Sequence, residues 1–153
     1  MMIRKMNRHV LFAMMLLVAG IASCKKSELD GEYTRCERCT YTFTDAGPLT
    51  FTYKHYFFDG PISNPATPYR GLSIEVPTGV DIFNYGDKEI ASDKVNYFVM
   101  CINCGVITLK TVGGTIKGMK INDRKWLLDA TIYLESENVN GRDTIVFKQL
   151  FTR

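Results

Sequence analysis

Four cysteines arranged as two C-x-x-C pairs are the residues of this chain best suited to chemistry. Cys36 and Cys39 form the first pair, and Cys101 and Cys104 form the second. Thiolates with this spacing hold Zn²⁺ at tetrahedral angles, form structural disulfides in exported proteins, or cycle between dithiol and disulfide. All three interpretations expect the two pairs to lie close together, as disulfide partners or as shared metal ligands.

The second pair falls where the predicted strand 95–101 should turn back into the predicted strand 106–112, and Gly105 follows it. A two-residue gap at such a bend, followed by glycine, resembles the metal knuckle of zinc ribbons and rubredoxin-like domains. The first pair resembles that knuckle less, because Thr40 stands where glycine is common. The resemblance implies a site of four cysteines for zinc, which is the one cofactor that the sequence suggests.

Few other side chains are candidates for catalysis. His9 and His55 are the only histidines of the chain, which excludes a histidine-cluster metal site. His55 is in phase with the apolar Phe51 and Tyr53, so we expect its imidazole to lie in the core and to bond to the backbone. The sequence contains no nucleophile elbow, zinc-protease motif or phosphate-binding glycine loop. We therefore predict that the protein is not an enzyme.

An aromatic strip and a proline-rich loop offer a binding face instead. The strip, residues 53–58, is apolar on both faces at its end, and the loop, residues 61–70, contains three prolines that rule out a regular strand. Stiff, exposed loops flanked by aromatic residues often bind partners. The residues that we expect to contact a protein or carbohydrate partner are Tyr56, Phe58, Tyr69 and Arg70.

After residue 32 the chain has the pattern of β-strands. Apolar and polar residues alternate over residues 40–44, 49–54, 72–76, 95–99 and 126–134. This period of two marks sheets with one buried face, and Gly113-Gly114 and Asn140-Gly141 suit hairpin turns. We predict one all-β domain over residues 33–153, built as a single antiparallel β-sandwich or as a small up-and-down barrel.

The N-terminal segment predicts where the protein works. Residues 1–23 combine a basic start with an apolar run that is uncharged from Val10 to Ala22. Such a run is short for a membrane span and typical of an export signal. The four residues Ile21-Ala22-Ser23-Cys24 resemble the lipobox of bacterial lipoproteins.

That resemblance implies that residues 1–23 are removed and that Cys24 is acylated, with residues 24–32 as a short tether. Several acyl chains hold a protein on a bilayer durably. Lys25 and Lys26 follow the cysteine in place of aspartate, so the resemblance points to the outer membrane of the cell envelope.

The charge balance gives no reason to expect a nucleic acid partner. The formal net charge of +3 equals the three basic residues of the signal, Arg4, Lys5 and Arg8, and the signal contains no acidic residue. The remaining domain is therefore neutral overall, and a balanced surface does not attract nucleic acid.

Together these features predict a lipid-anchored envelope lipoprotein whose β domain is a binding or structural module. Two alternatives stay open at this point. The first is a metalloprotein with a structural zinc ion bound by the four cysteines. The second is a lipocalin-like carrier, whose apolar ligand would lie in a cavity lined by residues such as Tyr97, Trp126 and Ile132.

Overall fold

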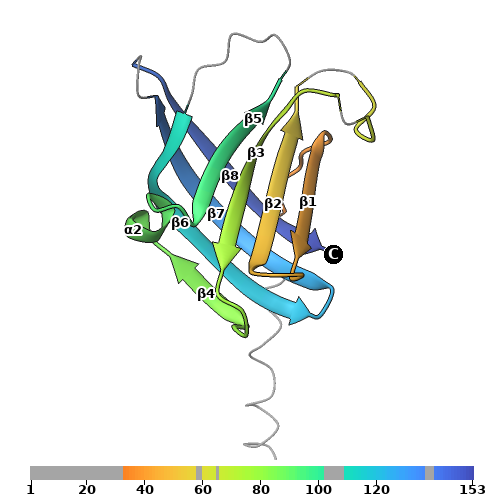
Figure 1. Cartoon of the computed structure of the whole chain (residues 1–153), viewed down its shortest axis with the longest axis vertical. Helices are drawn as coiled ribbons and strands as arrows, with labels where there is room; N and C mark the ends of the chain where they lie inside the picture. Colours follow the sequence, from red (N-terminus) through yellow and green to blue (C-terminus); the bar gives the residue numbers. More distant parts are fainter. Residues whose placement is uncertain (1–32, 58–59, 65, 102–108, 137–139) are drawn as a thin grey trace, which may run out of the picture. The chain divides into compact units, whose positions relative to one another are not determined.

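The computed structural model describes residues 33–57, 60–64, 66–101, 109–136 and 140–153. In these ranges eight strands form one sheet that curls into a half-barrel (Figure 1). The strands are β1 (Cys39–Thr44), β2 (Leu49–Tyr56), β3 (Tyr69–Val76), β4 (Ile82–Tyr85), β5 (Val95–Met100), β6 (Leu109–Asn122), β7 (Lys125–Ser136) and β8 (Arg142–Thr152). The all-β prediction is confirmed.

A single helical turn, α2 (Asp87–Ile90), lies between β4 and β5 in the sequence. Four residues are too few to produce a helical apolar stripe, so the sequence pattern did not reveal it. Among the described residues no helix has the length and apolar character needed to cross a membrane.

The sheet consists of two antiparallel meanders that meet along one parallel contact. Strands β1, β2 and β3 form the first meander and β6, β7 and β8 the second. They join where β1 lies parallel to β8, with Thr42 opposite Thr152. β5 extends the sheet beyond β3, and β4 extends it beyond β6. The sheet is therefore mixed and single, which differs from the predicted antiparallel sandwich or up-and-down barrel.

The half-barrel has two ends, which we call the mouth and the base. The mouth is the end where β2 and β5 finish and where β3 and β8 begin, at the top of Figure 1. The base is the opposite end, where β2 begins and β8 finishes.

Aromatic rings fill the concave face between these ends. Phe51 is fully buried, and the ring centroids of Phe43, Phe83, Trp126 and Phe151 lie 5.2–5.8 Å from its own. Stacked, tilted and edge-on contacts at these distances add to the free energy gained from burial. The core is therefore a packed aromatic cluster drawn from both meanders.

The Gly113-Gly114 pair lies inside β6, so the prediction of a hairpin there is wrong. The pairing of β6 with β7 shifts register between Thr111 and Gly113, which marks a β-bulge. Gly114 has φ of 129°, and a Cβ there would come within 2.0 Å of the Thr131 carbonyl oxygen. Glycine is needed here for a bend within a strand rather than for a turn between strands.

Two side chains tie this bulge to α2 and β5. The buried hydroxyl of Thr111 lies 2.9 Å from the Ile90 carbonyl oxygen and 2.8 Å from the Val95 carbonyl oxygen, and it shares its proton between them. The Asp87 carboxylate accepts a hydrogen bond of 2.6 Å from the Gly114 N–H. Because β5 and β6 are not neighbours in the sheet, these bonds hold two distant parts of the sheet together.

We predict that Thr111→Val lowers the free energy of unfolding by about 1–3 kcal/mol, because it keeps the shape of the side chain but leaves two buried carbonyls without their donor. Urea denaturation of the full-length protein measures this change. Thr115→Val is the matched control on the exposed side of β6 and should change the value by less than about 0.5 kcal/mol. Equal effects of the two substitutions would contradict the role given to Thr111.

Candidate functional site

Polar side chains gather at the mouth, at the end of a concave face that is otherwise apolar. Arg70 on β3 donates a hydrogen bond of 2.6 Å from Nη1 to Oδ2 of Asp143 on β8. Strands β1 and β2 lie between these two strands in the sheet, so the ion pair forms because the sheet curls. Both side chains are about one-third exposed, at 29% and 35%, so solvent screens the pair in part.

Tyr53 and Tyr97 lie near this ion pair, and Tyr41 packs against Tyr53. Burial raises the pKa of Tyr53 and of Tyr97, while the positive charge of Arg70 opposes the rise. Tyr97 also forms a side-chain hydrogen bond with Arg70. The ring of Tyr41 lies 5.4 Å from that of Tyr53, and burial raises the pKa of Tyr41 to about 12. At neutral pH these phenols therefore keep their protons, so each can donate one hydrogen bond and can also accept one, as Tyr97 does from Arg70.

His55 lies beside the same cluster and not in the core, so its predicted burial there is wrong. Its strand partners are Cys39 on β1 and Arg70 on β3, and it is half-buried because β2 reaches the mouth at this position. Burial, and then the charges of Arg70 and Arg38, lower the pKa of His55 below 6.5. The Phe57 ring lies 5.9 Å from the imidazole and 6.0 Å from the Arg70 guanidinium.

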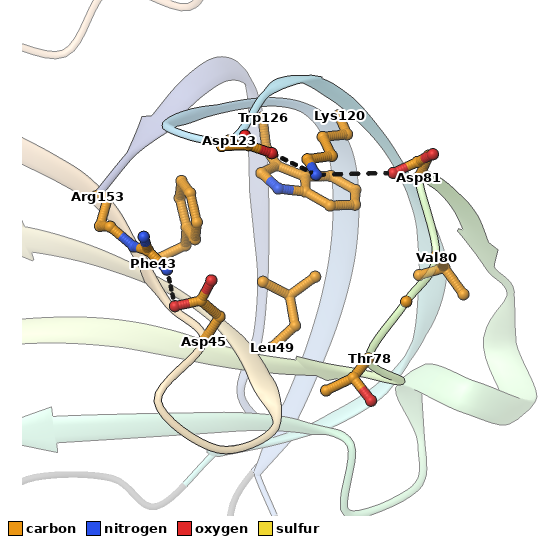
Figure 2. A pocket seen from close by; sticks show the side chains of 11 residues that line it. Phe43, Asp45, Leu49, Thr78, Val80, Asp81, Lys120, Asp123, Trp126 and Arg153 are labelled. Carbon is orange, nitrogen blue, oxygen red and sulfur yellow. Dashed lines mark hydrogen bonds and ion pairs between the residues drawn. The ribbon is translucent and has the colours of Figure 1, made fainter.

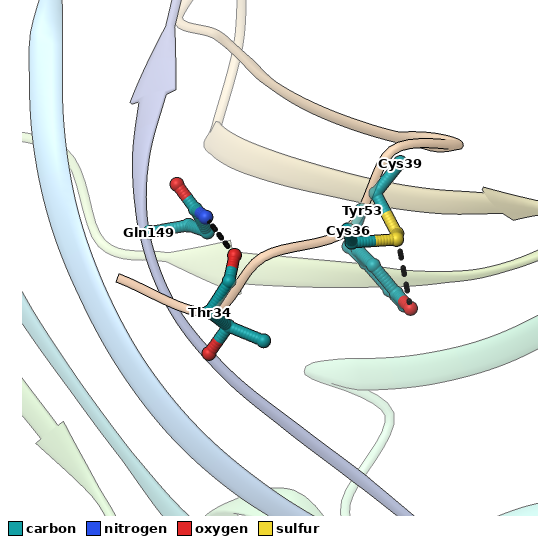
Figure 3. The surroundings of a disulfide bond; sticks show 5 residues. All are labelled: Thr34, Cys36, Cys39, Tyr53 and Gln149. Atoms are coloured by element: carbon teal, nitrogen blue, oxygen red, sulfur yellow. Dashed lines mark hydrogen bonds between the residues drawn. A yellow bond between two sulfur atoms is a disulfide. The ribbon is translucent and has the colours of Figure 1, made fainter. Parts of the chain in front are cut away.

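A disulfide between Cys36 and Cys39 borders the cluster (Figure 3). The two Cα atoms lie 5.4 Å apart, and the Tyr53 hydroxyl lies 3.8 Å from Cys39 Sγ. Because the bond closes a loop of only four residues, loop-closure entropy contributes about 2 kcal/mol. This is about half of what a long-range cross-link between the two pairs would contribute in the same treatment.

The chain before the disulfide is held to β8. The Thr34 N–H donates to the Lys148 carbonyl at 3.0 Å, and the Lys148 N–H donates to Thr34 Oγ1 at 2.9 Å. The Gln149 side chain also donates to the Thr34 carbonyl, as Figure 3 shows. These bonds position the Cys36–Cys39 turn at the edge of the mouth.

The expectation that the two cysteine pairs share one site is not met by the described cysteines. Cys36 bonds to Cys39, and Cys101 is itself disulfide-bonded, whereas Cys104 lies outside the described residues. Two strands separate β1 from β5, which corresponds to about 14 Å across the sheet. The predicted bend between residues 101 and 106 does not join sheet neighbours either, because β5 pairs with β3 and not with β6.

A different set of metal-binding atoms does come together. One sulfur each from Cys36 and Cys39 and one imidazole nitrogen of His55 lie within 4.8 Å of one another, and Cys101 is not part of this group. The sequence spacing of the cysteines could not reveal this group, because His55 comes from the neighbouring strand.

The four residues predicted to bind a partner do not share one surface. Arg70 lies in the mouth, but Tyr56 and Tyr69 lie on the convex face, where their rings pack 5.3 Å apart and Phe98 lies 6.0 Å from Tyr69. Phe58, and Cys24 of the lipobox-like segment, lie outside the described residues. The sequence missed Asp143, because only the curl of the sheet brings it to Arg70. It named Tyr97 as a residue that lines a cavity and not as a partner of Arg70, although their strands are neighbours in the sheet.

The chain matches no family model, and neither curated proteins nor solved structures match it. The functional argument therefore rests on the site itself.

We predict that Arg70→Met raises the pKa of His55, because it removes a repelling guanidinium and releases the Asp143 carboxylate. His55 is the only histidine after residue 9, so its imidazole C–H resonances give the pKa directly by NMR titration of the processed full chain. Arg124→Met, at the exposed turn between β6 and β7, is the control and should leave this pKa unchanged. An unchanged His55 pKa in Arg70→Met would contradict the placement of the two side chains.

The same lowered pKa makes stability depend on pH. The unfolded chain binds a proton at His55 more readily than the folded chain does, so protonation favours unfolding. Above about pH 6.5 His55 is mainly neutral in both states, so it does not lower the free energy of unfolding. As the pH falls below that value towards the folded pKa, the free energy of unfolding decreases.

Proposed function

We propose that this chain is a lipid-anchored lipoprotein of the bacterial envelope and that its β domain is a binding module that takes an anionic group at the mouth. The main support for this binding site is the Arg70–Asp143 ion pair. It spans the mouth, and Tyr97 and His55 lie beside it. The lipobox-like residues 21–24 support the anchor.

The electrostatics of the mouth favour an anion. Burial, and after it the guanidinium groups of Arg70 and Arg38, lower the pKa of His55. Arg38 is held in place by a hydrogen bond of 2.9 Å from Nη2 to the Gly60 carbonyl. Guanidinium groups, phenols and an imidazole together recognise carboxylate or phosphate groups through charge-assisted hydrogen bonds.

The packing of the core favours a ligand at the mouth over one enclosed in the barrel. A lipocalin-like carrier would need an enclosed cavity that reaches Ile132, and this side chain is 0% exposed within the packed core. Tyr97, another residue expected to line such a cavity, contacts Arg70 instead. These contacts support the proposed binding at the mouth.

We predict that inorganic phosphate or acetate, added at constant ionic strength, raises the pKa of His55 in a saturable way, because a bound anion offsets the field of the two arginines. The measurement is the NMR titration described above. Arg70→Met should abolish the saturable response, and Arg124→Met should retain it. A His55 pKa that responds to these anions no more than to chloride would refute the anion site.

A second candidate function is a zinc site, and the grouping of Cys36, Cys39 and His55 specifically favours it. A dithiol reductant supplies two electrons and two protons, which cleave the S–S bond to two thiols. Deprotonated thiols and a neutral imidazole are zinc ligands. The lowered pKa of His55 keeps its imidazole neutral at pH 7.

We predict that the reduced full-length protein retains one zinc ion in native mass spectrometry and that the oxidised protein retains none at this site. His55→Gln and Cys39→Ser should each lose the ion, whereas Cys101→Ser should keep it. Loss of zinc in Cys101→Ser would indicate the site of four cysteines instead, and retention in His55→Gln would exclude histidine from the ligands.

A further inference from the structure

A pocket of about 530 Å³ opens at the base, at the opposite end of β2 from the mouth (Figure 2). Phe43, Leu49 and Trp126 form its apolar floor. These three side chains are 3–6% exposed, so they present edges of the packed core to the pocket. The volume lies within the range of about 300–1,000 Å³ that is usual for small-molecule sites.

Charged side chains form the walls of this pocket in two opposed groups. On one wall Lys120 Nζ lies 2.8 Å from Oδ1 of Asp123 and 3.9 Å from Oδ1 of Asp81. On the other wall Arg153 is paired with Asp45, and its guanidinium lies 5.9 Å from the centre of the Phe43 ring. Figure 2 shows the Lys120 group and the Arg153–Asp45 pair on different sides of the pocket.

This pairing of charges determines which ligands fit. The two cations of the walls, Lys120 and Arg153, face three carboxylates, those of Asp45, Asp81 and Asp123. The walls therefore repel an anion, and a cationic ligand would have to displace Lys120 or Arg153 from its carboxylate partner. A neutral hydroxyl group meets neither obstacle, because it donates to a carboxylate and accepts from an ammonium or guanidinium at the same time. A molecule with hydroxyl groups along its edges and C–H groups on its faces also suits an apolar floor.

We propose that the pocket at the base binds a neutral saccharide. The walls supply alternating donors and acceptors for its hydroxyl groups, and the floor contacts its C–H faces. This site is separate from the anion site at the mouth, since Leu49 and His55 lie near opposite ends of β2. The protein therefore has a second binding surface, one that recognises sugar.

Trp126 is the only tryptophan of the chain and lies in the floor of the pocket, so its fluorescence reports binding there. We predict a saturable change when the full-length protein in detergent is titrated with glucose, galactose, N-acetylglucosamine, maltose or cellobiose. Lys120→Met and Asp45→Asn should each weaken the affinity at least tenfold. Lys120→Met removes a donor from one wall, and Asp45→Asn replaces an acceptor oxygen of the other wall with an NH2 donor. Lys117→Met, an exposed position on the same strand, is the matched control and should bind as the wild type does.

Saturation-transfer NMR with the same sugars provides a second readout that does not depend on a fluorescence change, and thermal unfolding verifies that each variant is folded. Absence of binding in both measurements would overturn the proposal. Equal binding by Lys120→Met, Asp45→Asn and the wild type would also overturn it. Stronger binding of glucuronate or glucosamine than of the neutral sugars would refute the neutral class.

Discussion

The bulge of β6 at Gly113-Gly114 is the constraint on which the rest of the fold depends. It lets one strand remain paired with β7 along its whole length while Thr111 bonds to α2 and β5 and the later part of the strand pairs with β4. The sheet can then curl around the aromatic cluster of Phe51. Without that curl, Arg70 and Asp143 would lie on strands separated by two others and could not form an ion pair.

The curl also separates the domain into a filled middle and two polar ends. Burial of the aromatic rings gives the domain its stability, and charged groups lie where the strands end and water reaches the concave face. At the mouth, arginines face a histidine and tyrosines. At the base, paired charges surround an apolar floor. The Cys36–Cys39 disulfide is local, so it fixes the shape of the mouth and contributes little to the cohesion of the sheet.

The sequence predicted strands well, because alternation of apolar and polar residues records which face is buried, as in β2 and β7. The sequence predicted a hairpin turn at Gly113-Gly114, where the structure has a bulge, because a glycine pair permits both. The alternation placed His55 on the same face as Phe51 but did not show that it lies at the mouth. Alternation indicates which face of a sheet a residue occupies and not how near it is to the end of the strand. The contact of Arg70 with Asp143, 73 residues away, depends on the topology of the sheet, so the sequence around either residue does not reveal it.

The central claim is that a lipid at Cys24 displays this domain on an envelope membrane, where the oxidising compartment keeps Cys36 and Cys39 bonded. Intact mass spectrometry of the protein extracted from bacterial membranes tests this claim most directly. The account predicts a chain that begins at Cys24 and carries the added mass of a diacylglyceryl group, usually with a further acyl chain. A chain that begins at another residue, or an unmodified Cys24, would contradict it.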